Sequence, residues 1–165
     1  MATVLLIYTI VLAYIAIVDF KTRKIANYWS LFNLFFSITL FIFLPQHYIL
    51  GYKHFFIPGL VFVAGFILYF MKIAGAGDVK FLSTFLIALP YDFQLLFVNK
   101  LVVSTIIFAL TVMGIKIITQ FKAFTDAIFS KNFQALRSVI FGSKFAYSPV
   151  LFFTLLLVIW ESGII

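Results

Sequence analysis

The chain has 165 residues, of which 65% are hydrophobic and only 10% are charged, and its formal net charge is +7. Ordinary soluble domains have about 25% charged residues, so this composition excludes a typical water-soluble globule. The chain has no cysteine, which excludes disulfides, thiolate metal sites and a cysteine nucleophile. The basic residues are scattered between apolar stretches, so the positive charge does not indicate binding of nucleic acid.

Apolar stretches that reach or approach the length of a membrane-crossing helix, about 20 residues, recur along the chain. Helices are expected because lipid offers no partners to open backbone groups, and no stretch alternates as a barrel strand does. The first stretch has no basic residue before it, which favours a span over a cleavable signal peptide. We expect one all-α integral-membrane domain over residues 1–165, a polytopic bundle of about six transmembrane helices at 1–18, 28–44, 55–71, a short stretch ending near 90, 95–118 and 145–160.

The fourth stretch is shorter than the others. If it ends at Pro90, it has about twelve residues and makes about 18 Å of helix, which is too short for a full crossing. Either this helix begins below the membrane surface, or Pro90 is a kink inside a longer helix.

Counting Lys and Arg residues predicts the orientation of the bundle. Six spans place ten of the twelve basic residues on one side, and only Lys53 and Lys100 on the other. The basic side is expected to be cytoplasmic, and both termini are expected to lie outside. The ten residues are Lys21, Arg23, Lys24, Lys72, Lys80, Lys116, Lys122, Lys131, Arg137 and Lys144.

Residues 119–142 show a helical period of apolar residues with charges between them. The apolar positions are Phe121, Phe124, Ile128, Ala135, Leu136 and Val139. This pattern predicts an amphipathic helix that lies on the anionic inner leaflet as a surface anchor.

The chain has five acidic residues, and the expected topology brings two of them to the same membrane face. Asp19 ends the first span and Asp78 begins the fourth. Asp78 has a structural explanation, because an acid is favourable at a helix N-terminus. Asp19 is expected at a helix C-terminus, where the dipole disfavours negative charge, although nearby basic residues would offset this in an interfacial ion cluster.

The functional interpretation of these acids is a pair of carboxylates. Two aspartates held close together do not both ionise, so one keeps a proton while the other acts as a general base. The base activates water for attack on a peptide carbonyl, and the protonated partner polarises that carbonyl and protonates the leaving amine. Gly75 and Gly77 precede Asp78 and allow a close approach of backbone or substrate.

Other motifs in the chain do not indicate a ligand site. The segment around Asp78 lacks the third glycine of a dinucleotide loop and the Ser or Thr of a phosphate-binding loop. His47 and His54 have no acidic residue or cysteine nearby in the sequence, so we expect them to be polar residues of an external loop at 45–54 and not zinc ligands. We expect neither a metal nor a cofactor.

The segment "DFKTRKIAN" at 19–27 resembles the Asp-x3-Arg-x-Ile-Pro-Asn motif of the type IV prepilin and preflagellin peptidases, and "GAGDVKF" at 75–81 resembles their Gly-x-Gly-Asp-x-Lys motif. These enzymes are membrane aspartyl proteases. The segment "AYSPVLF" at 146–152 is similar to the Pro-containing motif that opens the last span of the family. Ala26 stands at the usual proline position, which concerns only the stiffness of that loop.

The resemblance implies that Asp19 and Asp78 are the catalytic aspartates. It implies supporting or substrate-contacting roles for Arg23, Asn27, Gly75, Gly77 and Lys80. It also implies a short, peptidase-only form without the cysteine-containing methyltransferase segment. Its substrates would be prepilin-like or preflagellin-like precursors, cut at the inner face of a bacterial or archaeal plasma membrane to remove a short basic leader.

Two non-enzymatic alternatives remain open at this point. One is a small transport or scaffold bundle in which the two aspartates form a cation or proton site. The other is an inactive interaction subunit, which would tolerate the loss of either aspartate.

Overall fold

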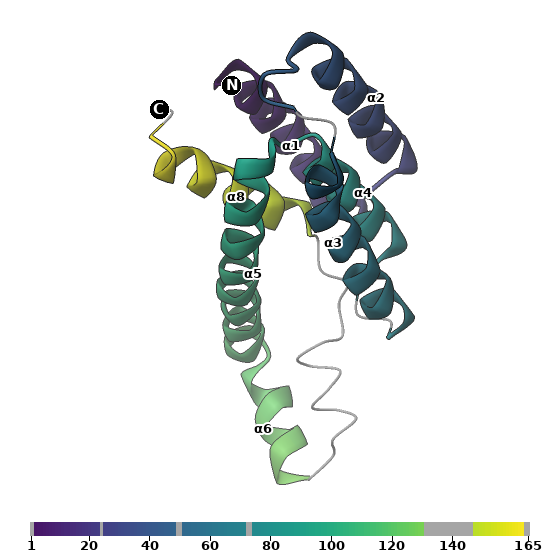
Figure 1. Cartoon of the computed structure of the whole chain (residues 1–165). Helices are drawn as coiled ribbons and strands as arrows, with labels where there is room; N and C mark the ends of the chain where they lie inside the picture. Colours follow the sequence, from purple (N-terminus) through teal and green to yellow (C-terminus); the bar gives the residue numbers. More distant parts are fainter. Residues whose placement is uncertain (1, 24, 49–50, 72–73, 131–146, 164–165) are drawn as a thin grey trace.

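The computed structural model describes residues 2–23, 25–48, 51–71, 74–130 and 147–163, and these contain helices and turns without a strand (Figure 1). The helices are α1 (Ala2–Thr22), α2 (Asn27–Phe43), α3 (Tyr52–Phe70), α4 (Ala76–Ile87), α5 (Tyr91–Thr119), α6 (Phe121–Phe129) and α8 (Ser148–Glu161). Helices α1, α3 and α5 are long and apolar enough to cross a membrane, and α2 and α8 are shorter apolar helices. The expected all-α membrane bundle is therefore confirmed.

Several helices extend beyond the apolar stretches that predicted them. Helix α2 agrees with its expected bounds within one residue, but α1 continues through Asp19 to Thr22 and α5 begins at Tyr91. Lys21 in the last turn of α1 and Asp92 in the first turn of α5 have charges that suit the helix dipole. A helix end therefore need not coincide with the end of an apolar stretch. For the sixth expected span, residues 145 and 146 lie outside the described residues.

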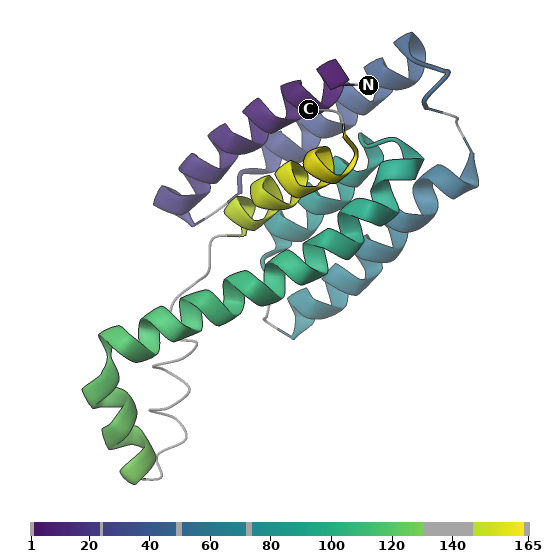
Figure 2. The same cartoon turned by 90° about the vertical axis from the view of Figure 1, so that its left-hand side faces the viewer.

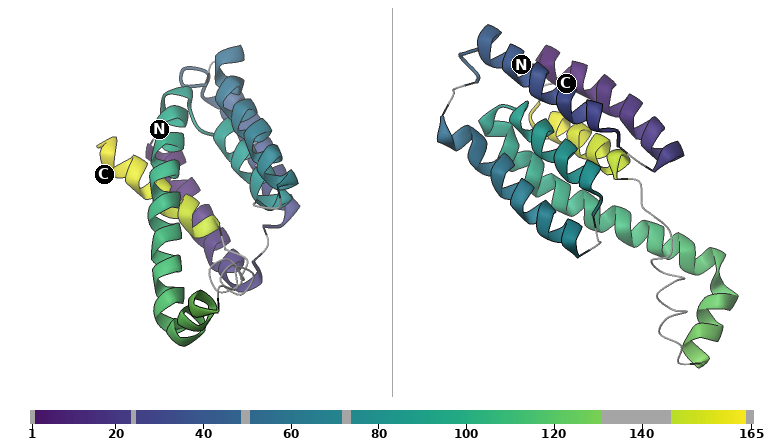
Figure 3. Two further views of the ribbon diagram at one scale, coloured as in Figure 1. Left: turned by 90° about the horizontal axis from the view of Figure 1, so that it is seen from below. Right: turned by 90° about the vertical axis from the view of Figure 1, so that its right-hand side faces the viewer.

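The helices form two layers (Figures 2 and 3). In one layer α4 packs between α2 and α3, and in the other α8 packs between α1 and α5. Tyr8 of α1 and Phe97 of α5 both contact Phe85 of α4, with ring centroids 5.1 Å apart in each pair. These aromatic contacts join the two layers in the core.

Helix α2 packs on α4 through a stripe of small and polar residues. Its buried residues are Ser30, Asn33, Ser37 and Leu40, which follow a spacing of three and four. Small side chains allow close packing of helices in a membrane, and polar ones bond across the interface. Asn33 does so, because its amide donates to the Thr84 hydroxyl of α4 at 3.4 Å.

Helix α4 ends inside the bundle, where polar side chains bind its last carbonyl groups. The Gln94 amide lies 3.0 Å from the carbonyl oxygen of Leu86 and 3.1 Å from that of Leu89. The Tyr48 hydroxyl donates to the carbonyl of Ala88 at 2.9 Å. The ring of His54 bonds the carbonyl of Ile87 at 2.8 Å. Side chains from other elements thus bond carbonyl groups of the last turn of α4 and of the two residues that follow it.

This arrangement corrects two sequence-based expectations. His54 is not a residue of an external loop, because it lies in α3 and is only 2% exposed. Pro90 is not a kink within a long helix, because it is the residue before α5 and α4 has already ended at Ile87. The fourth stretch is therefore a short separate helix, and its start below the membrane surface stays a prediction.

The second half of α5 projects beyond the other helices and is followed by α6 (Figure 2). Helix α6 is amphipathic, with Phe121 and Ile128 close together around the helix and Lys122 and Asp126 on another side. The expected amphipathic helix is thus present over Phe121–Phe129, and the remainder of that expectation, residues 131–142, lies outside the described residues.

Both ends of the chain lie at the same end of the bundle (Figure 2). Lys100 of α5 and Glu161 of α8 form an ion pair there. Asp19, in the last turn of α1, lies at the opposite end of the bundle from the two termini. The two termini therefore share one side, as the expected topology requires.

Replacing Gln94 tests the role of the polar cluster at the end of α4. Gln94→Leu leaves buried carbonyl groups without a donor, and we expect the free energy of unfolding to fall by about 1–3 kcal/mol. Gln46→Leu is the matched control, because Gln46 is exposed, and it should leave stability unchanged. Thermal unfolding of both variants in detergent measures the difference. Equal stability of the two variants would contradict the assignment.

Candidate active site

Asp19 completes the buried stripe of α1. The stripe runs through Leu5, Tyr8, Leu12 and Ile15 to Asp19, with steps of three and four residues, and Asp19 is 2% exposed. Side chains at this spacing lie on one face of a helix. The carboxylate therefore points into the bundle and away from the basic residues that follow it.

The carboxylate of Asp19 lies at the N-terminus of α8. Its Oδ2 accepts a hydrogen bond of 3.0 Å from the backbone N–H of Ser148, the first residue of α8. The first N–H groups of a helix have no partners within it, and the helix dipole favours an anion at this end. The unfavourable position of Asp19 at the end of α1 is thus offset by its favourable position at the start of α8.

Asp78 lies in the first turn of α4 and bonds the backbone that precedes the helix. Its carboxylate accepts a hydrogen bond from the N–H of Gly75, the residue before α4, as the third residue of a capping box does. The expected structural role of Asp78 at a helix N-terminus is therefore present. A Cβ on Gly75 would lie 2.8 Å from Oδ2 of Asp78, so the absent side chain makes room for the carboxylate.

The surroundings of Asp78 favour its protonated form. Burial, and to a smaller extent the charge of Asp19, raise the pKa of Asp78 from 3.8 to about 6, although the hydrogen bond from Gly75 lowers it. Asp78 lies outside the three helices that are long enough to cross a membrane. The two aspartates are 59 positions apart in the chain, and the charge of one nevertheless acts on the other.

Gly77 allows α4 to lie against the connection between α1 and α2. A Cβ at Gly77 would lie 2.7 Å from the backbone carbonyl oxygen of Ile25, which is closer than such atoms can approach. The same connection contains Arg23 with a φ of 52°, a left-handed conformation that is uncommon for residues other than glycine. The chain therefore makes a tight turn after α1 and then passes directly over the start of α4.

A cleft of about 1230 Å³ opens beside Asp78. Six of the seven residues predicted from the sequence line it, namely Arg23, Asn27, Gly75, Gly77, Asp78 and Lys80. Asp19 does not line the cleft, but its neighbours Val18 and Thr22 do. The predicted residues are thus brought together from both layers, with Asp19 just behind the wall of the cleft.

Ala26, at the position of the family's usual proline, keeps a backbone that suits proline. Its φ of −73° lies within the range that a proline ring imposes. The missing proline has therefore not changed the local course of the chain.

Tyr147 and Thr105 also belong to the site and were not singled out from the sequence. Both line the cleft, and their hydroxyl groups lie 3.4 Å apart. Burial raises the pKa of the Tyr147 phenol, the bond with Thr105 lowers it, and the charge of Asp78 raises it further. One sequence feature could have pointed to Tyr147. The segment Tyr-Ser-Pro at 147–149 contains a proline that marks a helix start.

The other acidic residues do not join this site. Asp92 and Asp126 are exposed, and Glu161 pairs with Lys100 at the far end of the bundle. Among the described residues, no group of three His, Cys, Asp or Glu side chains is placed to hold a metal ion. The cleft itself presents the carboxylate of Asp78, the hydroxyl groups of Tyr147 and Thr105, and the cations Arg23 and Lys80.

Comparison of the chain with known protein families finds a match to the type IV leader peptidase family over residues 6–159. The match includes both aspartates and all the residues that line the cleft, and it agrees with the resemblance of the two aspartate motifs. Searches of curated proteins and of solved structures found no match.

Replacing Gly77 tests the close contact between α4 and the α1–α2 connection. Gly77→Ala forces this backbone apart, and we expect overpacking to lower the free energy of unfolding by about 1–3 kcal/mol. Gly114→Ala is the matched control, since nothing lies within 4 Å of a Cβ at Gly114 in α5, and it should stabilise by up to about 1 kcal/mol. Thermal unfolding measures both, and an unchanged Gly77→Ala protein would contradict the contact.

Proposed function

The chain belongs to the type IV leader peptidase family, and from this premise we propose that it is an aspartic endopeptidase using Asp19 and Asp78. Its substrates are prepilin-like or preflagellin-like precursors, from which it removes a short basic leader at the cytoplasmic face of the plasma membrane. The observation that carries this proposal is the placement of the half-buried Asp78 on the wall of a cleft with the buried Asp19 close behind it, near enough for its charge to raise the pKa of Asp78.

The two carboxylates have different surroundings, and these suggest different roles. Asp19 accepts a hydrogen bond from a backbone N–H at a helix N-terminus, and we assign it the role of general base. Asp78 has a raised pKa, so it keeps the proton and is the general acid. Two carboxylates in different surroundings can perform acid and base steps together.

The proposed reaction needs only water and these two groups. Asp19 takes a proton from water as the water oxygen bonds to the carbonyl carbon of the peptide, and the proton of Asp78 stabilises the oxygen that becomes negative. Asp78 then donates its proton to the leaving amine as the C–N bond breaks, and the proton that Asp19 took from water returns the pair to one shared proton. Since the cleft reaches Val18 and Thr22, the residues on either side of this part of α1, we propose that water reaches Asp19 from the cleft.

The remaining residues of the cleft are suited to holding an extended peptide. Gly75 and Gly77 present backbone without side chains beside Asp78, and Arg23, Asn27 and Lys80 place polar groups around it. Correct positioning of a peptide bond near the catalytic groups accounts for a large share of enzymatic rate enhancement. We propose that these residues contact the substrate and that none of them transfers a proton.

The proposed location follows from charge. The aspartates lie at the end of the bundle opposite the termini, and ten of the twelve Lys and Arg residues are assigned to that side by the count of spans. The positive-inside rule makes this the cytoplasmic side. We further propose that the protein is a peptidase without methyltransferase activity, since the cysteine pairs of such a segment are absent from the sequence.

A transport bundle finds less support than a peptidase. Such a protein needs polar residues that form a path through the membrane. The buried hydroxyl groups of Ser37, Ser83 and Thr154 instead donate to carbonyl groups of their own helices at 2.7–2.8 Å. These hydroxyl groups are therefore satisfied locally, as is usual for Ser and Thr in such helices.

Replacing each aspartate separately tests the proposed pair. We expect Asp19→Asn and Asp78→Asn each to lower the rate of precursor cleavage by about 10²–10⁴-fold, because each removes a proton-transfer group. Asp92→Asn and Asp126→Asn are matched controls on exposed acids and should cleave normally. Cleavage of a co-expressed precursor is measured by the shift in its size on a gel, with the amount of each variant in the membrane checked. Normal cleavage by either active-site variant would rule out the pair.

The pH dependence of cleavage tests the role of Asp78. Because the acid must hold its proton, kcat/KM should fall as the pH rises through the raised pKa of Asp78, about 6. An ordinary aspartate would place this fall near 3.8. The measurement is kcat/KM across a pH series for the wild-type protein and for Asp92→Asn, which should share one profile. A rate that stays constant from about pH 5 to about pH 8 would exclude Asp78 as the acid.

A further inference from the structure

We propose that the hydrophobic helix of the substrate docks in the cleft between α3 and α5, entering sideways from the bilayer, and that this places the cleavage segment beside Asp78. The inference rests on the proposed function, because it takes a precursor with a hydrophobic helix as the occupant. It adds the route of entry and the helices that form the docking surface.

The size of the cleft favours a polypeptide over a small ligand. Its volume is about 1230 Å³, whereas small-molecule sites are about 300–1,000 Å³. A helix is about 10 Å across with its side chains, so the volume of the cleft equals that of about three helical turns. The occupant is therefore expected to be a segment of chain.

The cleft has both polar and apolar lining residues. Asp78, Arg23 and Lys80 lie around the connection between α1 and α2 and the start of α4. Val61 of α3 and Ala109 of α5 belong to walls made by membrane-crossing helices. A precursor with a polar cleavage segment followed by an apolar helix has the same two kinds of surface, so its helix would lie against α3 and α5 while its polar segment reaches Asp78.

The cleft lies between two helices that contact each other mainly at one end. His54 of α3 and Gln94 of α5 bond there, with the Gln94 amide 3.1 Å from the carbonyl oxygen of His54. Away from that contact the two helices separate (Figure 1). Leu68 on α3 and Ile106 on α5 are 41% and 55% exposed in this region. Apolar side chains are thus exposed on both helices where they separate, and we propose that the substrate helix enters there.

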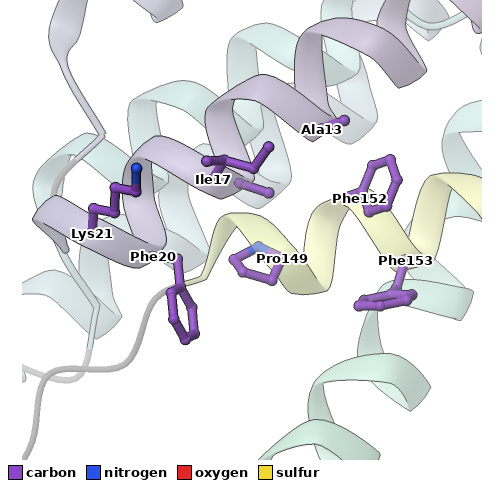
Figure 4. A pocket seen from close by; sticks show the side chains of 8 residues that line it. Ala13, Ile17, Phe20, Lys21, Pro149, Phe152 and Phe153 are labelled. Carbon is purple, nitrogen blue, oxygen red and sulfur yellow. The ribbon is translucent and has the colours of Figure 1, made fainter.

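A second groove, on the outer side of α1 and α8, fits the substrate less well (Figure 4). Its volume is about 480 Å³, and its walls include Ala13 and Ile17 of α1 and Phe152 of α8. Neither aspartate lines this groove, and Lys21 lies at its end. A precursor docked there would leave its cleavage segment separated from Asp78 by α1.

The absence of cysteine from the chain allows a direct test by disulfide trapping. Three single-cysteine variants are made in an Asp78→Asn background, so that the substrate stays uncut: Ala109→Cys in the cleft, Ala13→Cys in the second groove, and Ile107→Cys on α5 outside both. The probe is a precursor of a short basic leader joined to a 20-residue Leu/Ala helix, with one cysteine moved through its first three turns. A disulfide forms only when the two Cβ atoms come within about 4.5 Å.

We expect Ala109→Cys to trap the probe at positions that repeat every three to four residues, and Ile107→Cys and Ala13→Cys to trap little. Wild-type protein is given the same probe in parallel. If wild-type protein cleaves the probe but trapping occurs at Ala13→Cys or follows no helical period, the docking inference is overturned and the proposed function stands. If wild-type protein does not cleave it, the proposed function fails and the inference fails with it.

Filling the cleft gives an independent measurement. Ala109 is exposed on α5, so Ala109→Trp should fold, and we expect it to raise KM about tenfold with little change in kcat, since it removes binding and not chemistry. Ile107→Trp is the matched control and should keep the wild-type KM. Equal KM values for the two tryptophan variants would contradict docking in this cleft.

Discussion

The hydrogen bond from the Ser148 N–H to Asp19 is the interaction on which the site depends. A carboxylate that is 2% exposed is very costly without a partner, and a hydrogen bond to a charged group contributes about 1.5–3 kcal/mol. The start of α8 supplies that partner from 129 positions away in the chain. The bond also fixes the position of Tyr147, which precedes Ser148 and lines the cleft beside Asp78. Asp19 and α8 therefore stabilise each other's position.

The position of Asp78 depends on the opposite end of α4. This helix has twelve residues, about 18 Å, and its C-terminus is held inside the bundle by Gln94, His54 and Tyr48. Because the C-terminus of α4 is anchored, the length of the helix determines the level at which Asp78 lies in the bundle. A helix of another length would shift Asp78 along the bundle, away from the level of Asp19. The buried polar cluster thus contributes to the site without touching it.

The number and order of the helices could be predicted from the lengths of the apolar stretches. Because membrane helices are apolar on most faces, the sequence does not show which face of a helix points inward. The buried stripe that ends at Asp19 was therefore not recognisable. His54 was misplaced because a buried histidine that binds a carbonyl of another helix leaves no local pattern. The cleft residues near Asp19 and Asp78 were predicted from two short motifs, whereas Tyr147 was missed, since its role depends on the helix that follows it.

The distance between the two carboxylates is controlled by the short connection after α1. Asp19 belongs to one layer and Asp78 to the other, and at this end the connection through Arg23 and Ile25 lies directly against Gly77. Arg23 adopts a left-handed backbone to make this turn, which costs of order 1–3 kcal/mol and is typical of functional sites. Because the contact at Gly77 is between backbone atoms with no side chain to give way, it acts as a fixed spacer. A peptide that enters the cleft then meets Asp78 on one wall and a backbone turn of set position on the other, with Asp19 directly behind it.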